Sequence, residues 1–201
     1  MQSFQKRDER YNKTTKSYIY SIPNNNAVDY QPKDLEVDPY YLGVWLGDGT
    51  SNKPNGICSI DDDIIKACEL FGKKYNLTST ITFDTNKYEK FRHLSLVGIQ
   101  GKSNILDKLF KELDLINNKH IPEKYLYSSY SQRMELLRGI MDTDGSCDKS
   151  GHIEFSTISL KLANDFSTLC RSLGISIRMT ERTTSYTHKG ETKQGKNSYR
   201  F

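Results

Sequence analysis

Cysteine is scarce and scattered in this sequence. Its four cysteines, Cys58, Cys68, Cys147 and Cys170, show neither the paired spacing of a zinc site nor the pattern of a disulfide framework. We expect these thiols to be reduced and mostly packed in the interior.

Long apolar runs are also lacking. No run approaches the roughly 18 residues that cross a membrane, and the polar opening MQSFQKRDER is unlike a secretory signal. The sequence therefore predicts a soluble intracellular protein of the cytoplasm or nucleus, with no membrane partner. Its 201 residues, 35% of them apolar, suffice for one large or two small domains.

An excess of one charge is lacking before the C-terminal region, because basic and acidic residues are equal in number there. Residues 178–201 hold six basic and two acidic side chains, whereas the rest of the chain holds 23 of each. A basic segment rich in Thr, Ser and Tyr suits contacts with DNA phosphates and base edges, although a solvated loop is a common alternative. The candidate DNA-binding residues are Arg178, Arg182, Lys189, Lys193, Lys196 and Arg200.

A nine-residue pattern occurs twice, as YLGVWLGDG at residues 41–49 and as LRGIMDTDG at residues 137–145. Each copy is typical of a short helix that ends in an acidic residue and a glycine. Asp38 and Pro39 fit the start of the first helix, and Ser131 is the expected cap of the second. A left-handed Gly49 or Gly145 would end each helix.

Small residues recur four positions apart within each copy. Such spacing puts them on one face of a helix and favours close contact between two helices. The candidate interface residues are Gly43, Gly47, Gly139 and Thr143. If the helices pack side by side, Asp48 and Asp144 emerge together where the helix C-termini add negative potential. Two carboxylates about 4 Å apart repel by about 4 kcal/mol at an effective dielectric constant of 20, which favours a hard cation there.

Both copies resemble the LAGLIDADG motif of homing endonucleases, with Asp48 and Asp144 at its acidic position. The segment KHIPEKYL at residues 119–126 is similar to the lysine-containing block of intein-encoded, dodecapeptide (DOD-type) members. Residues 18–39 are similar to the segment that joins an intein's splicing domain to its endonuclease. Met1 and Phe201 fit neither splice junction, so the resemblance implies an endonuclease portion without the splicing domain.

The resemblance implies an α+β fold, namely a pseudo-twofold pair of αββαββα half-domains with saddle-shaped antiparallel sheets. It also implies a monomer that binds a long asymmetric target in double-stranded DNA. In this reading Asp48 and Asp144 hold Mg²⁺, which activates water and neutralises charge at scissile phosphates, and Lys119 tunes or orients that water. These three residues are the candidate catalytic set.

The regions after the two motifs repeat the same order of elements. In the first copy we expect strands at residues 57–60, 77–83 and 91–97, with helices at 61–75 and 104–113. In the second we expect strands at residues 153–157 and 175–180, a helix at 159–173 closed by Gly174, and a last strand beginning at 199–201. The expected domains are a lead-in at 1–37, a first half-domain at 38–130 and an incomplete second half-domain at 131–201.

Two other readings compete with a site-specific endonuclease. A LAGLIDADG protein that binds DNA or RNA without cutting, either maturase-like or a degenerate intein fragment, would keep the same fold. An ordinary α+β domain with an accidental repeat would have no reason to place a lysine block at the matching distance from Asp144.

Overall fold

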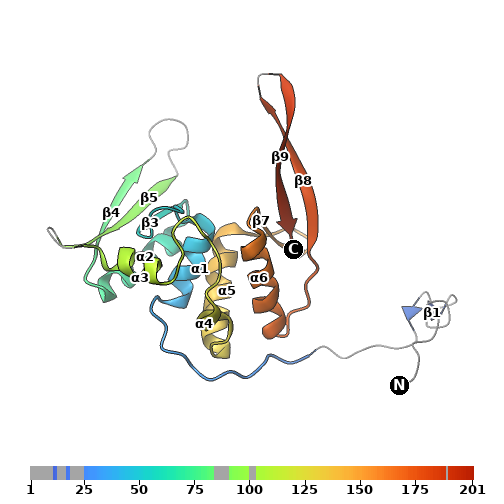
Figure 1. The fold of residues 1–201 in the computed structure, drawn as a ribbon, viewed down its shortest axis with the longest axis horizontal. Helices are drawn as coiled ribbons and strands as arrows, with labels where there is room; N and C mark the ends of the chain where they lie inside the picture. Colours follow the sequence, from blue (N-terminus) through green and yellow to red (C-terminus); the bar gives the residue numbers. More distant parts are fainter. Residues whose placement is uncertain (1–10, 13–16, 19–24, 84–90, 100–102, 189) are drawn as a thin grey trace.

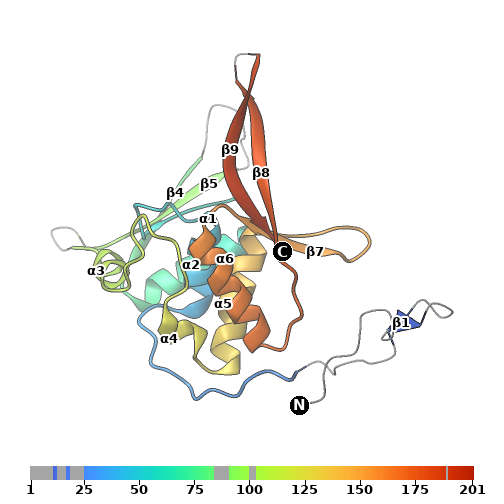
Figure 2. The same cartoon turned by 45° about the vertical axis from the view of Figure 1, so that its right-hand side comes forward.

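A computed structural model describes residues 11–12, 17–18, 25–83, 91–99, 103–188 and 190–201. Two units of similar design lie side by side, each with one central helix and one antiparallel sheet (Figure 1). The two central helices, α1 (Pro39–Asp48) and α5 (Tyr130–Asp144), pack against each other between the sheets. Figure 2 shows both sheets rising from the same side of this helix pair.

The first unit continues from α1 through three strands and three further helices. These elements are β3 (Gly56–Ser59), α2 (Asp62–Lys74), β4 (Thr78–Phe83), β5 (Arg92–Val97), α3 (Ile105–Glu112) and α4 (Glu123–Leu126). The sheet has the order β3-β5-β4, and a single bridge from Gly49 to Ile57 lies beside β3.

The second unit repeats this order with four strands and one helix after α5. They are β6 (Gly145–Cys147), β7 (Ile153–Thr157), α6 (Leu160–Ser172), β8 (Thr180–His188) and β9 (Glu191–Arg200). The strand order β6-β7-β9-β8 equals that of the first sheet when its bridge counts as the first strand. The predicted α+β fold with a duplicated unit is confirmed. A separate two-residue pair, β1 (Tyr11–Asn12) and β2 (Ser17–Tyr18), precedes both units.

The two central helices begin at different kinds of cap. The Asp38 side chain accepts hydrogen bonds from the first turn of α1, and Pro39 occupies its first position, as predicted. The prediction of Ser131 as the cap of α5 is wrong, because Ser129 takes that position. Ser129 and Gln132 satisfy each other's backbone N–H groups in a capping box, which fixes the helix start two residues earlier.

The glycines after both central helices are extended, so the prediction of a left-handed conformation is wrong. Gly49 has φ −74° and Gly145 has φ −79°, because each leads directly into strand pairing. Glycine is needed there for space, since a Cβ atom would lie 2.3 Å from the carbonyl oxygen of Trp45 or Met141, respectively. Gly174, which closes α6, does have a left-handed φ of 77°.

Two strand predictions in the second unit need correction. Residues 175–179 are not in a strand, and β8 instead runs from Thr180 to His188. The corresponding part of β4 pairs with residues 95–97 of β5, whereas the pairing of β8 with β9 begins at Thr180 opposite Arg200. Tyr199 lies near the end of the last strand and does not begin it.

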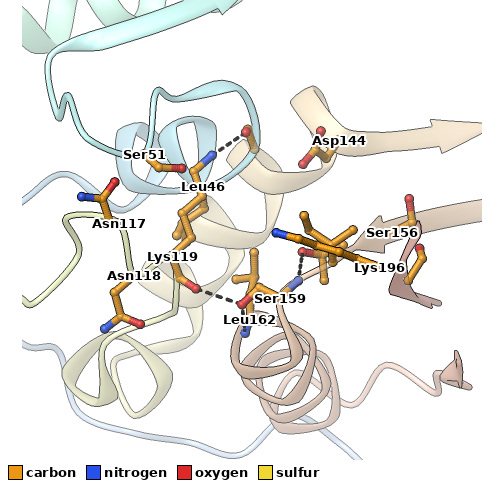
Figure 3. Close-up of a pocket in the computed structure, with 14 residues that line it drawn as sticks. Leu46, Ser51, Asn117, Asn118, Lys119, Asp144, Ser156, Ser159, Leu162 and Lys196 are labelled. Atoms are coloured by element: carbon orange, nitrogen blue, oxygen red, sulfur yellow. Dashed lines mark hydrogen bonds between the residues drawn. The ribbon is translucent and has the colours of Figure 1, made fainter. Parts of the chain in front are cut away.

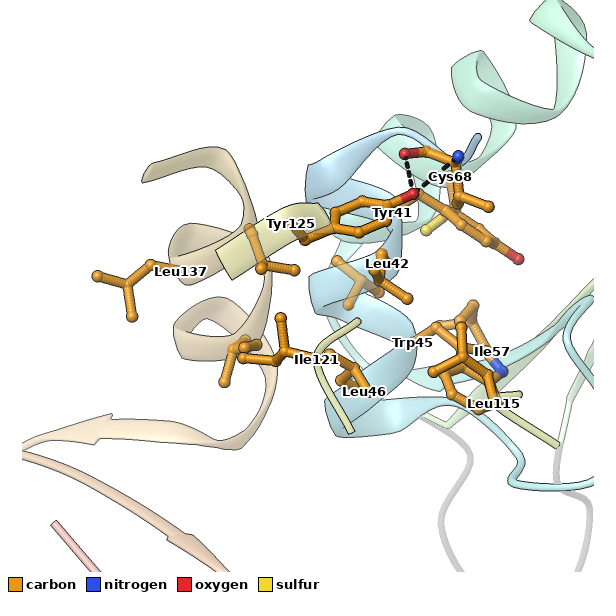
Figure 4. Close-up of a cluster of buried hydrophobic side chains, with 14 of the residues drawn as sticks. Tyr41, Leu42, Trp45, Leu46, Ile57, Cys68, Leu115, Ile121, Tyr125 and Leu137 are labelled. Carbon is orange, nitrogen blue, oxygen red and sulfur yellow. Dashed lines mark hydrogen bonds between the residues drawn. The ribbon is translucent and has the colours of Figure 1, made fainter. Parts of the chain in front are cut away.

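The main core surrounds α1 (Figure 4). The Tyr41 ring stacks on Phe71 of α2 with their centroids 3.8 Å apart, and its hydroxyl donates to the Pro54 carbonyl. Trp45 is fully buried and meets Phe110 of α3 edge to face. The second unit has its own aromatic group, in which Phe155, Phe166 and Phe201 pack together between sheet and helix. Aromatic rings of this size supply much of the apolar burial in a small unit.

The segment at residues 25–38 lies along the helices on the side away from the sheets (Figure 1). Arg133 of α5 is fully buried and ties this segment to the second unit. Its guanidinium donates to the carbonyls of Val28, Ser128 and Ser172, so a buried charge is satisfied by backbone oxygens. None of the helices in the described parts of the chain has the length and apolar character that crossing a membrane requires.

Candidate active site at the helix seam

The two central helices approach each other at Gly43 and Gly139. A Cβ atom on Gly43 would lie 2.3 Å from the Leu136 carbonyl oxygen, and one on Gly139 would lie 2.3 Å from the Tyr40 carbonyl oxygen. Backbone atoms cannot retreat from such contacts without moving a helix. Any side chain at either position would therefore force the helices apart.

One turn further along, Gly47 faces Thr143. A Cβ atom on Gly47 would meet the Thr143 hydroxyl at 2.1 Å and the carboxyl carbon of Asp144 at 3.4 Å. The Thr143 hydroxyl donates to the Gly139 carbonyl of its own helix. The four small residues thus lie along one seam, and this seam brings the end of α5 beside the end of α1.

Asp48 and Asp144 are the last residues of α1 and α5 and interact electrostatically. Burial and the neighbouring Asp144 raise the pKa of Asp48 to about 6. Burial also raises the pKa of Asp144, while the charge on Lys119 opposes that rise. The Asp144 side chain is exposed and lines a cleft. Both carboxylates are thus destabilised as anions, a situation that a bound cation would relieve.

Lys119 reaches the same place from the segment between α3 and α4. Its amino group donates to the Gly47 carbonyl at 2.8 Å and lies 5.3 Å from the centroid of the Trp45 ring. The hydrogen bond uses a carbonyl at the C-terminal end of α1, where helices attract cations. Burial lowers the pKa of Lys119 to about 8, although the negative charges of Asp144 and Asp48 act to raise it.

The second unit holds the backbone around Lys119. The Ser159 hydroxyl donates to the Lys119 carbonyl at 3.3 Å, and the Ile121 N–H donates to a carboxylate oxygen of Asp165 in α6 at 2.9 Å. These two positioning residues were not predicted. They lie 40 and 44 residues from their partners, and no local pattern marks them.

A cleft of about 640 Å³ opens beside Asp144 and Lys119 (Figure 3). Hydroxyl and amide side chains line much of it, together with a few apolar ones. Besides these two residues, the lining includes Leu46, Ser51, Asn117, Asn118, Ser156, Ser159, Leu162, Lys196 and Ser198. Among the described residues, no cluster of three or more His, Cys, Asp or Glu side chains could hold a metal. A cation here would therefore be held by two carboxylates and would take its remaining ligands from water or phosphate, as Mg²⁺ commonly does.

The candidate DNA-binding residues occupy several environments. Arg182 of β8 and Arg200 of β9 line a smaller cavity that also reaches Asp144, but Arg200 forms an ion pair with Glu154. Lys196 lines the larger cleft, and Lys193 lies near Glu191 toward the tip of the hairpin. Two members of the set lie elsewhere: Arg178 is exposed before β8 begins, and Lys189 lies outside the described residues.

Comparisons with known proteins give both a domain family and a fold. Residues 131–200 match the family model of a LAGLIDADG-like domain. The chain is 34% identical over 155 residues to the replicative DNA helicase DnaB of Mycobacterium intracellulare, covering 77% of this chain and 22% of that protein. It is 26% identical over 167 residues to the homothallic switching endonuclease of Saccharomyces cerevisiae, covering 71% of this chain and 28% of that protein. The chain thus spans about a quarter of the length of these curated relatives.

Solved structures share the arrangement over most of the chain. A crystal structure of I-DmoI in complex with DNA and Mn matches with a TM-score of 0.51 and 16% identity, covering 81% of this chain and 86% of that one. Variants of the homing endonuclease I-DmoI match with a TM-score of 0.50 over 81% of this chain and 85% of theirs. At this identity the likeness concerns the fold alone. The family model thus shows a LAGLIDADG-like domain at residues 131–200, and the solved structures show that most of the chain has the fold of a homing endonuclease.

Proposed function

We propose that this chain is a site-specific DNA endonuclease that uses a divalent metal ion, most simply Mg²⁺. The observation that carries the proposal is the convergence of Asp48, Asp144 and Lys119 at the ends of two closely packed helices. A purely structural domain gains nothing from placing two partly buried carboxylates together, where Asp144 adds to the rise in the pKa of Asp48. A phosphodiester hydrolase needs such a pair to hold a metal ion.

Each side chain has a defined part in this proposal. Asp48 and Asp144 would hold the metal ion, which supplies Lewis acidity and neutralises charge on the phosphate when bound. Lys119, held against the Gly47 carbonyl, would orient a water molecule and stabilise negative charge at the reacting phosphate. The small residues of the seam would keep the carboxylates at their spacing, so Gly43, Gly47, Gly139 and Thr143 would act by position alone.

The DNA would lie across the two sheets on the side where the motif aspartates emerge. This side carries the basic residues Arg182, Lys196 and Arg200 near Asp144. I-DmoI structures of the same fold were solved with DNA and with Mn or Mg, which supports a DNA partner and a divalent ion. We further propose a monomer, since both motif helices come from one chain.

We also infer an intein origin. The lysine block at residues 119–126 and the lead-in at 18–39 support it. So does the match to a replicative helicase over only 22% of that protein, because an endonuclease-like segment fits a helicase best as an insertion. DNA that carries the corresponding host gene without the insertion is then the expected target.

The test is cleavage of a duplex recovered from a randomised pool by its binding to this chain. We expect cleavage with Mg²⁺, none with EDTA, and a loss of at least about 100-fold in Asp144→Asn, since a metal ion contributes several kcal/mol. Asp142→Asn is the matched control: this carboxylate is on the same helix and accepts a hydrogen bond from Tyr40, which an amide oxygen can also accept. Binding without cleavage under every condition would instead identify a cleavage-deficient DNA-binding protein.

A further inference from the structure

The β8–β9 hairpin contains an irregularity at Lys196. Thr183 pairs with Asn197 and Ser185 pairs with Gln194, so Thr184 alone faces both Gly195 and Lys196. This is a β-bulge, in which one strand has an extra residue. The Thr184 hydroxyl donates to the Lys196 carbonyl at 2.7 Å, and a Cβ atom on Gly195 would lie 2.3 Å from that hydroxyl. The hydrogen bond of Thr184 and the absence of a side chain at Gly195 therefore stabilise the bulge.

Regular alternation along β8 and β9 decides which side chains near Asp144 share the open face of the second sheet. Arg182, Thr184, Ser198 and Arg200 line the cavities beside Asp144, which places them on this face. Lys196 is two residues before Ser198 on β9, so both side chains lie on the same face, and Lys196 lines the larger cleft.

Lys196 and Lys119 approach the same cleft from opposite units. Figure 3 shows the Lys196 side chain extending into the cleft, with its amino end directed toward the space between Lys119 and Asp144. Lys119 belongs to the segment after α3 of the first unit, whereas Lys196 belongs to the last strand of the second. Lys119, Lys196 and Asp144 thus line the same cleft.

The charge on Lys196 is available to a ligand. Among the described residues it has no ion-pair partner, whereas Arg200 is paired with Glu154 and Lys193 lies 3.9 Å from Glu191. An uncompensated lysine beside two hydroxyl side chains, Ser156 and Ser198, is well suited to a phosphate group.

We propose that Lys196 is a further catalytic residue, which contacts the scissile phosphate that lies beside Asp144. This inference rests on the proposed endonuclease function. In the hydrolysis, a bond forms between a water oxygen and phosphorus, one ester bond from phosphorus to oxygen breaks, and the proton lost by water ends on the departing hydroxyl. Lys196 transfers no proton. Its ammonium group stabilises the charge that builds on the non-bridging oxygens.

Because Lys196 lies on the Asp144 side, its loss should affect the two DNA strands unequally. We would label the strands of the selected duplex with different dyes and measure both cleavage rate constants with Mg²⁺. Lys196→Met should slow one strand by about 100-fold, the effect of removing one preorganised donor. The other strand should be cut at close to the rate of the unaltered chain.

Lys193→Met is the matched control, because it removes the same charge from the same strand farther from Asp144. It should weaken DNA binding without changing the ratio of the two strand rates. Equal slowing of both strands by Lys196→Met, or no slowing, would overturn the role of Lys196 and leave the endonuclease function intact. No cleavage by the unaltered chain would overturn both.

A second measurement needs no cleavage. One scissile phosphate at a time is replaced by an uncharged methylphosphonate, and duplex binding is measured in EDTA. When the replaced phosphate is on the strand beside Asp144, the unaltered chain and Lys193→Met should bind the duplex more weakly than they bind the unmodified duplex. Lys196→Met should bind both duplexes equally, because it has already lost the contact with that phosphate. Equal losses in all three proteins would show that Lys196 does not touch that phosphate.

Discussion

The two sheets have the same strand order, but the side chains on their open faces differ in charge. In the first sheet, strand pairing puts Thr78, Thr80, Thr82, His93, Ser95 and Val97 on one face, while Leu94 and Leu96 are buried on the other. Within the described strands β3, β4 and β5, this open face holds neither lysine nor arginine. The corresponding face of the second sheet holds Arg182, Lys196 and Arg200.

The contrast shows which positions a duplicated fold leaves free to differ. Helix caps, seam glycines and inward-facing apolar residues must be kept in both units, because each unit needs them to fold. The open faces carry no such requirement. We therefore expect the two units to contribute differently to a shared DNA partner, one through phosphate charge and the other through hydroxyl contacts.

The largest effect is expected from a substitution that disrupts the contact between the two units, where α1 packs against α5. Gly43→Ala puts a methyl group 2.3 Å from the Leu136 carbonyl oxygen. We expect a loss of about 3 kcal/mol in the free energy of unfolding, the upper range for overpacking. Urea denaturation would measure it.

Gly56→Ala serves as the control, because its methyl group would meet its nearest neighbours only at 3.5 Å or more. If Gly43→Ala were as stable as Gly56→Ala, the close approach of α1 and α5 would be refuted, and the shared site with it.

Local sequence signals predicted most helix ends and most strands. Asp61, Asn104 and Ser159 cap their helices as their positions suggest, since a cap depends on residues two or three positions away. The capping box of Ser129 and Gln132 was also readable, and it outweighs the competing Ser131.

Distant partners decided the features that the sequence could not reveal. Residues 175–179 repeat the strand pattern of β4, but a strand needs a neighbour, and the pairing of β8 with β9 begins only at Thr180. The bulge at Lys196 depends on the register between two strands, and register is not a local property. The convergence of the two motif aspartates could be expected only because the small-residue stripe repeats.

Salt dependence would sharpen the contrast between the sheets. Arg182→Gln should lower the slope of log affinity against log salt by about 0.9, the contribution of one neutralised phosphate. Thr80→Val, on the open face of the first sheet, should leave this slope unchanged while lowering affinity at every salt concentration. Titration of the selected duplex between low and moderate salt would measure both. Equal slope changes in the two variants would mean that the sheets do not differ in how they contact DNA.

The smallest expected effect is on the free energy of unfolding of the metal-free protein, which depends on the protonation of the two motif aspartates. The folded-state pKa of Asp48 is about 6, above the unfolded value of about 3.9. Between these values the folded protein binds more protons than the unfolded chain, so stability falls as pH rises through this window. Asp48→Asn should remove much of that fall and stabilise the metal-free protein at pH 7 by about 1 kcal/mol.

Asp144→Asn should also relieve the repulsion, but it leaves the nearby Lys119 with one less counter-charge. We therefore expect a smaller gain than in Asp48→Asn. Urea unfolding in EDTA at pH 5 and pH 7 would compare the variants. If neither asparagine stabilised the protein at pH 7, the carboxylates would not be close enough to compete for a proton, and they could not share a metal ion either.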